Sequence, residues 1–600
     1  MQPSVGGRRR APDDTDLREF FPLMYRLHGS DLVPFGAQRA SFEYRAAFGF
    51  CLIGLSALLA RDARSQEPVA PRSARARIER IDPMVEMQRA AIELDRATWG
   101  HWGPMEDRYS SWTSHSNRLI PVYAFGFQFD QIPGFGKAYR SPERLRELYG
   151  QVPPQTLAPE ATYFDQVDVF LWQQAAVAAG KKHLIIVIFD GMDWQIAQAA
   201  ACYAQGRVTH QEGRGTGLKF MDYCGTESSF GYCVTSPFGE SESVDVDGQI
   251  LTAPVVPTGG YDPSRGGENP WTSKVNLDYL IGKDRSMPHA VTDSASSATS
   301  ICAGIKTYNE AINVDAQGKP VAPLAHELQQ NRGWSIGVVT SVPISHATPA
   351  AAFAQNVSRE DYQDLTRDML GLPSVVRRAS PLSGVDVLIG AGWGESCDQD
   401  KKQGQNFIPG NRYLAEPDLQ QIQADPRYVV AQRSPGRDGA TVLDEAARRA
   451  AAEGRRLFGF FGGPNGHLPF TTADGRFDPV RDKGPREVYS AADIDENPSL
   501  AQMTQAALRV LEQDRDGFWL MVEAGDVDWA CHANNLDNAI GAAICGDEAV
   551  SEIFRWVEER NGWDDTAVLV TADHGHLFVT RDIAAIAEAG ARAQQQLRAH

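Results

Sequence analysis

The stretch KKHLIIVIFDGMD, residues 181–193, decides the fold class of this chain. Its apolar run ends at an acid, Asp190, and a glycine. An unbroken apolar run of this length indicates a strand that is buried on both faces, as in parallel sheets. Because sites in open parallel sheets form outside the carboxyl ends of the strands, we expect Asp190 to carry chemistry.

Similar apolar runs recur along the chain, and helical patterns lie between them. The runs are WSIGVVTS (334–341), VDVLIGAGW (385–393), RRLFGFFGG (455–463), GFWLMVEAGD (517–526) and TAVLVTADHGH (566–576). Residues 497–513 and 547–560 have the spacing of amphipathic helices. This alternation predicts an α/β fold, with a mostly parallel central sheet and helices on both faces.

Composition divides the chain into three regions. Residues 1–66 form an N-terminal extension, and residues 67–180 form an added region to which the sequence assigns no role. Residues 181–600 hold the predicted sheet. Within them, the Gly-, Ser- and Pro-rich segment 203–290 is expected to be a surface insertion.

The extension contains the apolar run AAFGFCLIGLSALLA, residues 46–60, preceded by Arg39 and Arg45. Its length and charge order are those of a signal peptide, and it is short for a membrane span. We therefore expect a periplasmic or secreted protein without a stable membrane span. An ordinary buried helix is the alternative, and Met24 is a candidate for the true start of the chain.

The net charge and the cysteine content exclude some classes of protein. A net charge of −19 argues against nucleic-acid recognition, because phosphate backbones require a basic surface. This negative net charge does not exclude small phosphorylated substrates. The eight cysteines indicate no dense disulfide framework. Cys224 and Cys233 either pair in an oxidising compartment or remain separate thiols.

Acids and imidazoles follow several of the predicted strands. Because these strand ends share one edge of the sheet, their side chains are expected to converge. Mixed carboxylate and imidazole sets suit zinc, whereas all-oxygen sets suit magnesium. Asp528 and His532 are four residues apart, so one helical turn would place both on one face. The converging residues are Asp190, Glu523, Asp526, Asp528, His532, Asp573, His574 and His576.

The hydroxyl-rich run VTDSASSATS, residues 291–300, lacks bulky side chains. With the residues that follow it, VTDSASSATSICAGIKTYNEAINVD closely resembles the nucleophile segment of the alkaline phosphatases. IVIFDGM, SHATPAAAFAQNVSRE, VEAGDVDWACH and VTADHGH resemble further segments of that family, in the family's order. The resemblance covers residues 181–576.

The resemblance implies hydrolysis of small phosphate monoesters through a phosphoserine intermediate. Ser294 would be the nucleophile, at the N-terminus of a tightly packed helix that faces the phosphate. Asp293 would orient Arg359, and Arg359 would clamp two phosphate oxygens in the bidentate geometry of a guanidinium.

The resemblance also implies two zinc ions and one magnesium ion. Asp190, Asp573 and His574 would bind the zinc nearest the serine, and Asp528 and His532 would bind the second zinc. Thr348, Glu523 and Asp190 would hold the magnesium. His346 and Trp529 lie beside these residues in sequence, as in some branches of the family, and would reduce the preference of that site for magnesium.

The chain departs from the family pattern at its C-terminus. The family places one more histidine ligand of the second zinc in a C-terminal His-Thr-Gly-like motif, and no such motif follows His576. Either the gene product is truncated, or the second zinc site is incomplete, or another histidine fills it. His576 and His467 are the candidates. Asp193 stands where the family has glycine, and we expect it to cap the next helix.

Alternative functions remain open at this point. One is a phosphodiesterase or another hydrolase of the same superfamily. Another is a catalytically impaired metal- or phosphate-binding homologue that lacks the last zinc ligand. Members of the family often form homodimers, and no dimer interface can be recognised in this sequence.

Overall fold

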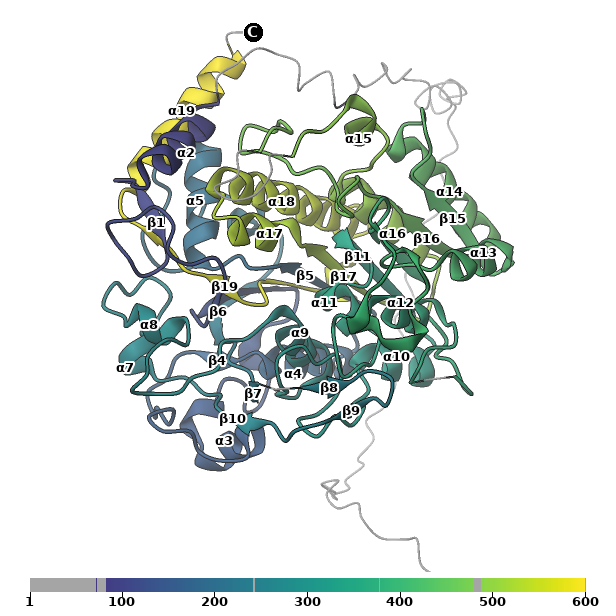
Figure 1. Ribbon diagram of the computed structural model, residues 1–600, viewed down its shortest axis with the longest axis horizontal. Helices are drawn as coiled ribbons and strands as arrows, with labels where there is room; N and C mark the ends of the chain where they lie inside the picture. Colours follow the sequence, from purple (N-terminus) through teal and green to yellow (C-terminus); the bar gives the residue numbers. More distant parts are fainter. Residues whose placement is uncertain (1–71, 73–81, 241–242, 377, 480–486, 599–600) are drawn as a thin grey trace, which may run out of the picture. The chain divides into compact units, whose positions relative to one another are not determined.

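The computed structural model describes residues 72, 82–240, 243–376, 378–479 and 487–598, and a ten-stranded sheet runs through them (Figure 1). Seven neighbouring strands are parallel, from β15 to β18. In spatial order the strands are β15 (Tyr428–Gln432), β16 (Arg456–Phe460), β12 (Val387–Ala391), β11 (Ser335–Pro343), β17 (Phe518–Ala524), β5 (His183–Phe189), β18 (Thr566–Thr571), β3 (Ile120–Phe125), β6 (Ser228–Val234) and β4 (Phe164–Asp165).

The predicted central strand, β5, lies between β17 and β18. Its residues from Leu184 to Phe189 have no solvent exposure, as the apolar run predicts for a strand covered on both faces. Ile188 is paired with Glu523 on one side and with Thr571 on the other. This register brings the carboxyl ends of the three strands to one edge of the sheet.

Helices cover both faces of the sheet, as the alternating pattern predicts (Figure 1). One layer contains α5 (Trp194–Gln205), α16 (Leu500–Leu511) and α18 (Leu536–Glu558). The other contains α4 (Val167–Ala178), α9 (Ser294–Ala303) and α10 (Leu324–Arg332). Asp193 caps α5 as expected, because its carboxylate accepts hydrogen bonds from the backbone N–H groups of Gln195 and Ile196.

The region before residue 181 is joined to the sheet rather than added as a separate layer. Its strand β3 pairs antiparallel with β18, the last parallel strand. Two shorter strands of the same region also pair with the chain after β18. β1 (Gly100–Trp102) pairs with β20 (Phe578–Thr580), and β2 (His115–Ser116) pairs with β19 (Gly575–His576). Residues 100–125 therefore pair with the C-terminal segment three times, once inside the main sheet through β3 and twice in small separate sheets through β1 and β2.

The segment 203–290 is only partly the surface insertion that its composition predicts. Its strand β6 pairs with β3 and β4 inside the main sheet, where Cys233 is buried. The glycines, serines and prolines around β6 give the whole segment a loop-like composition, which concealed this strand. Cys224 is exposed and both cysteines are free thiols, so the structure has no disulfide between them.

Among the described residues, none of the helices combines the length and the apolar character needed to cross a membrane. The signal-like run 46–60 and Met24 lie outside the described residues. The last described helix, α19 (Ile583–Arg598), packs against α5 and α2 (Pro83–Leu94).

Candidate active site

The hydroxyl-rich run forms the start of α9, and Ser294 is its first residue. Asp293 is the N-cap, since its carboxylate accepts a hydrogen bond of 3.0 Å from the N–H of Ser296. Every residue of α9 is buried, because only small side chains let the helix approach its neighbours so closely.

The other hydroxyls of α9 are engaged inside the protein. Ser297 donates to the carbonyl of Asp573, and Thr299 donates to the carbonyl of Ala311 at 3.0 Å. Ser294 differs, because its Oγ lies 3.2 Å from Nε2 of His574. The run therefore presents one hydroxyl to the strand ends and uses the others to hold the helix in place.

Asp190, Asp573 and His574 form the buried cluster, with one ligand atom from each within 4.8 Å of the others. Asp190 follows β5, and the other two residues follow β18. Nε2 of His574 lies 3.2 Å from Oδ1 of Asp190 and, as noted, 3.2 Å from Oγ of Ser294. The cluster and the serine hydroxyl thus meet at the same imidazole.

The buried cluster fits a bound cation. Oδ2 of Asp190 and Oδ2 of Asp573 are buried and have no hydrogen-bond partner among the described residues. The pKa of Asp190 is raised well above its ordinary value, first by the loss of solvent and then by the negative charge of Asp573. Buried carboxylates that repel each other need a positive partner, and a divalent metal ion would supply it.

His115, Asp528, His532 and His576 form the half-open cluster, which also brings four ligand atoms within 4.8 Å. Asp528 and His532 lie on α17 (Asp526–His532), one turn apart as their spacing predicts. Oδ1 of Asp528 lies 2.7 Å from Nε2 of His576, and Nε2 of His532 lies 3.1 Å from Nε2 of His115. The side chain of His532 is 39% exposed and that of His115 is 15% exposed.

The ionisation of this second cluster also suits a metal ion. Burial lowers the pKa of His115 well below its ordinary value, and the neighbouring His574 and His532 lower it further. The imidazole of His115 is therefore neutral, which is the form that coordinates metals. Burial alone would raise the pKa of Asp528, but the adjacent imidazoles, His532 first, hold it well below the ordinary value.

His115 is the site residue that the sequence reasoning missed. It lies in TSHSNRLIPVYAF, far before the recognised motifs, and β2 places it opposite His576. The only local signal was the apolar run 120–125 after it, which becomes β3.

Of the three alternatives for the second zinc site, the position of His115 favours the one in which another histidine takes the place of the C-terminal ligand. His576 also belongs to the cluster. His467 does not, because its Nε2 lies 3.3 Å from Oε1 of Glu487 and its Nδ1 lies 2.6 Å from the carbonyl of Leu468.

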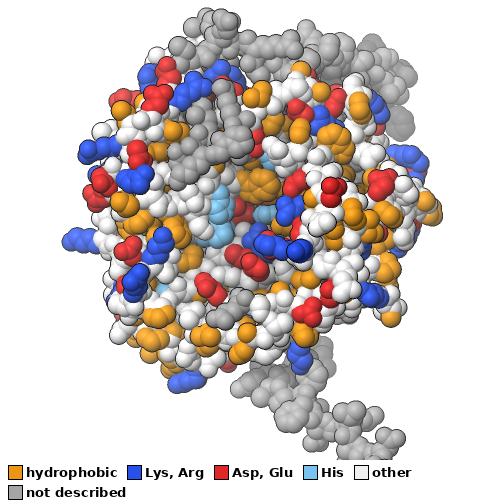
Figure 2. Space-filling view, in the orientation of Figure 1, with side chains coloured by type: hydrophobic (Ala, Val, Ile, Leu, Met, Phe, Trp, Pro, Cys, Tyr) orange, Lys and Arg blue, Asp and Glu red, His pale blue; other side chains and the backbone are white. Residues whose placement is uncertain are grey.

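Arg359 lines the same pocket as Ser294 and contacts Asp293, the residue that the resemblance implies would orient it. Its Nη1 donates to Oδ2 of Asp293 at 3.0 Å, and its Nη2 lies 3.3 Å from Nε2 of His346. These groups line one pocket of about 730 Å³, together with Ser294 and members of the half-open cluster. Figure 2 shows histidine, acidic and basic side chains gathered near the centre of the face drawn, which is the composition of this pocket.

Besides Asp190, the residues expected to hold magnesium are Glu523 and Thr348, and both are fully buried. Glu523 ends β17 and is fully buried, and burial raises its pKa to about 8. Its Oε2 accepts a hydrogen bond from Thr340, whereas its Oε1 and the hydroxyl of Thr348 have no hydrogen-bond partner among the described residues. His346 and Trp529 are in ring contact, with centroids 5.7 Å apart.

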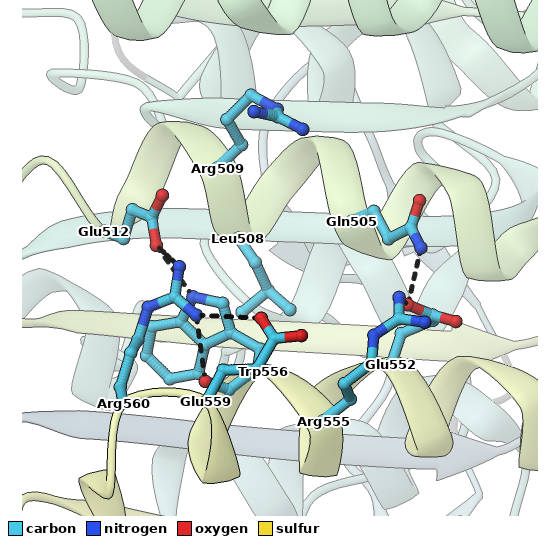
Figure 3. Close-up of a pocket in the computed structure, with 9 residues that line it drawn as sticks. All are labelled: Gln505, Leu508, Arg509, Glu512, Glu552, Arg555, Trp556, Glu559 and Arg560. Atoms are coloured by element: carbon cyan, nitrogen blue, oxygen red, sulfur yellow. Dashed lines mark hydrogen bonds and ion pairs between the residues drawn. The ribbon is translucent and has the colours of Figure 1, made fainter. Parts of the chain in front are cut away.

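A second hollow, of about 350 Å³, lies between α16 and α18 (Figure 3). It is lined by no histidine, and its charged groups form ion pairs with one another or, for Arg509, with Asp444 outside the hollow. Arg560 pairs with Glu512 and lies over the ring of Trp556, while Arg555 and Gln505 both contact Glu552. The residues that line this hollow give no indication of a catalytic or metal-binding site.

The structure is an α/β protein with two groups of candidate metal ligands, a serine hydroxyl and an arginine at the carboxyl edge of its sheet. Residues 274–596 match the family model described as alkaline phosphatase. This match covers more than half of the chain, and the chain belongs to the alkaline phosphatase family.

Curated relatives show the same family at modest identity. The chain is 30% identical over 315 residues to alkaline phosphatase H of Pseudomonas aeruginosa (strain UCBPP-PA14), a match that covers 50% of this chain and 60% of that protein. It is 29% identical over 314 residues to the alkaline phosphatase of Escherichia coli (strain K12), covering 50% and 61%. Alkaline phosphatase 3 of Bacillus subtilis (strain 168) is 27% identical over 300 residues, covering 49% and 52%. The chain spans about half to three fifths of the length of these relatives.

Solved structures of the same description are also similar. The Thermus thermophilus alkaline phosphatase is 23% identical, with a TM-score of 0.39, and the match covers 66% of this chain and 60% of that chain. A cold-active enzyme from Shewanella sp. is 22% identical, with a TM-score of 0.37, and the match covers 66% and 68%.

Proposed function

We propose that this chain hydrolyses phosphate monoesters through a phosphoserine intermediate on Ser294. The observation that carries this proposal is the position of the Ser294 hydroxyl. It lies at a helix N-terminus, in contact with His574 of the buried cluster and in the same pocket as Arg359 and the half-open cluster. A phosphate dianion placed there would meet positive groups on several sides.

The ligand sets follow from the two clusters. The buried cluster would hold the zinc ion nearest Ser294, and the half-open cluster would hold the second zinc ion, with His115 as its additional histidine. Asp190, Glu523 and Thr348 would hold magnesium. When bound, these ions would stabilise the serine alkoxide, the leaving oxygen and the attacking water.

The residues of the chain would then act in two displacements. In the first, Oγ of Ser294 bonds to phosphorus as the ester bond breaks, and the alcohol leaves with a proton. In the second, the oxygen of water bonds to phosphorus, inorganic phosphate leaves and Oγ of Ser294 regains its proton. Arg359 would hold two phosphate oxygens throughout, and its orientation is fixed by the 3.0 Å contact with Asp293.

His115 bears on the alternative of an impaired homologue. That alternative was motivated by a missing zinc ligand, and a histidine at this place supports a complete ligand set instead. By the same reasoning, we propose that the catalytic unit includes residues 100–125 as well as the region from 181 onward.

The experiment is hydrolysis of a chromogenic phosphate monoester at alkaline pH by the metal-loaded full chain. We expect turnover that a chelator abolishes and that Ser294→Ala lowers by more than about 100-fold. The matched control is Ser300→Ala, because Ser300 lies on the same helix and, among the described residues, its hydroxyl donates to the carbonyl of Ser296 and does not line the pocket. A phosphorylated Ser294 peptide after acid quench would establish the intermediate, and full turnover by Ser294→Ala would overturn the proposal.

We also propose that the protein acts in the periplasm or is secreted, on the basis of the signal-like run 46–60. Fractionation of cells that express the whole chain tests this directly. Recovery of the intact chain in the cytoplasmic fraction would contradict it.

A further inference from the structure

One residue at the mouth of the pocket has an unusual backbone. Glu310 has φ of +74°, the largest positive value among the non-glycine residues that the structure describes. This left-handed conformation favours glycine, and the other residues that adopt it are Asp, Asn or Gln. A glutamate there costs about 1–3 kcal/mol. Such a residue persists where the surroundings fix it and where its side chain has a use.

The surroundings do fix the backbone of Glu310. Its N–H donates to Oδ2 of Asp293 at 3.1 Å, and its carbonyl accepts a hydrogen bond of 2.7 Å from the N–H of Arg359. The main chain of Glu310 therefore links the two residues that are expected to hold the phosphate. Any residue could make these bonds, so they do not explain a glutamate side chain.

The side chain of Glu310 is exposed at the pocket mouth, and its carboxylate makes no ion pair within the described part of the chain. Glu360 lines the same pocket, but its carboxylate is held by Lys402 at 2.6 Å. Among the described residues that line the pocket, Glu310 is therefore the exposed carboxylate without a direct ion pair, although the charges of Arg359 and Lys402 act on it from farther away. Tyr362 and Trp529 add two aromatic rings to the lining.

We propose that Glu310 selects phosphate monoesters whose leaving group carries a positive charge, such as an amino alcohol. This inference rests on the proposed function. With the phosphate on Arg359 and Ser294, the leaving group points outward along the mouth, where a carboxylate and aromatic rings attract an ammonium group. The same carboxylate repels substrates with a second anionic group.

The experiment compares two esters of the same shape on the metal-loaded full chain. Phosphocholine carries a quaternary ammonium, and 3,3-dimethylbutyl phosphate replaces the nitrogen by carbon. We expect kcat/KM for phosphocholine to be about fivefold higher, which corresponds to one partly exposed cation contact. In Glu310→Gln the ratio should fall to about one, and added salt should lower the wild-type ratio.

The control is Glu327→Gln, which removes an exposed glutamate of α10 that does not line the pocket. It should keep the wild-type ratio. Hydrolysis of p-nitrophenyl phosphate distinguishes a failure of the selectivity by Glu310 from a failure of the proposed phosphatase function. If the wild type hydrolyses it but shows a ratio near one, or if Glu310→Gln keeps the full ratio, this inference fails while the proposed function stands. If the wild type hydrolyses none of the esters, the proposed function fails and this inference fails with it.

Discussion

The two clusters at the sheet edge are built in different ways. The buried cluster takes all its residues from the ends of two adjacent parallel strands, and its side chains have no solvent exposure. The half-open cluster joins one helix with two short paired strands from distant parts of the chain, and His532 is 39% exposed. The core of the sheet thus determines the first cluster, whereas the second depends on a contact between distant segments. Substitutions in the two clusters should therefore differ in their effects on turnover, metal content and thermal stability.

The largest effect is expected from a change in the buried cluster. Asp190→Asn removes a ligand that is shared between the proposed zinc and magnesium sites. We expect turnover to fall by well over 100-fold, since changes in groups that only support a ligand already cost about 10–100-fold. Without metal, the variant should unfold at a higher temperature than the wild type, because repulsion with Asp573 is relieved. Asp107→Asn, at an exposed position, is the control for both measurements.

A change in the half-open cluster should leave the buried cluster occupied. We expect His115→Ala to lose about one metal ion per chain and roughly 100-fold in turnover. Metal content measured by mass spectrometry tests this, with His467→Ala as the matched control because His467 faces Glu487. A His115→Ala protein with the metal content of the wild type would contradict the assignment of His115.

The two clusters should release their metal ions at different rates when a chelator is added. Because His532 and His115 are partly exposed, the half-open cluster is expected to release its metal first, and activity should be lost in that phase. The buried cluster should release its metal later, with a fall in thermal stability. Metal content and activity followed together under excess chelator measure the order. Release in a single phase would remove the distinction between the two clusters.

The smallest effect is expected at the residue between the clusters. Gly191 has φ of +73°, its N–H donates to Asp573 at 3.0 Å, and a Cβ there would lie 3.0 Å from atoms of Asp528 and His576. The methyl group of Gly191→Ala should therefore displace residues of both clusters, and the substitution should cost about 1–3 kcal/mol in stability. We expect a fall in turnover of roughly tenfold, by analogy with other changes that support metal ligands. Thermal unfolding measures the loss of stability, and kcat measures the loss of turnover. A variant as stable and as active as the wild type would show that the space around Gly191 accommodates a methyl group.

The comparison also explains what the sequence could predict. Asp190, Asp573 and His574 were found because they lie within three residues of the end of an apolar run, so the pattern that predicts the strand also locates the candidate ligand. Asp528 and His532 were found from helical spacing. His115 was not, because β2 is two residues long and its pairing with β19 is decided by tertiary contacts that no local pattern encodes. Strand β6 was missed for a different reason, because SSFGYCV lies within the Gly-, Ser- and Pro-rich segment 203–290, whose overall composition is that of a loop.

The pairing of His115 with His532 has a consequence for how the protein is made. The two imidazoles are 417 residues apart in the chain. At a translation rate of about 5–20 residues per second, His115 leaves the ribosome roughly 20–80 s before its partner. During that interval the nascent chain carries a histidine that has no coordination site to join. A metal ion that needs both histidines could therefore be captured only after His532 has also been made, when these two distant segments first meet.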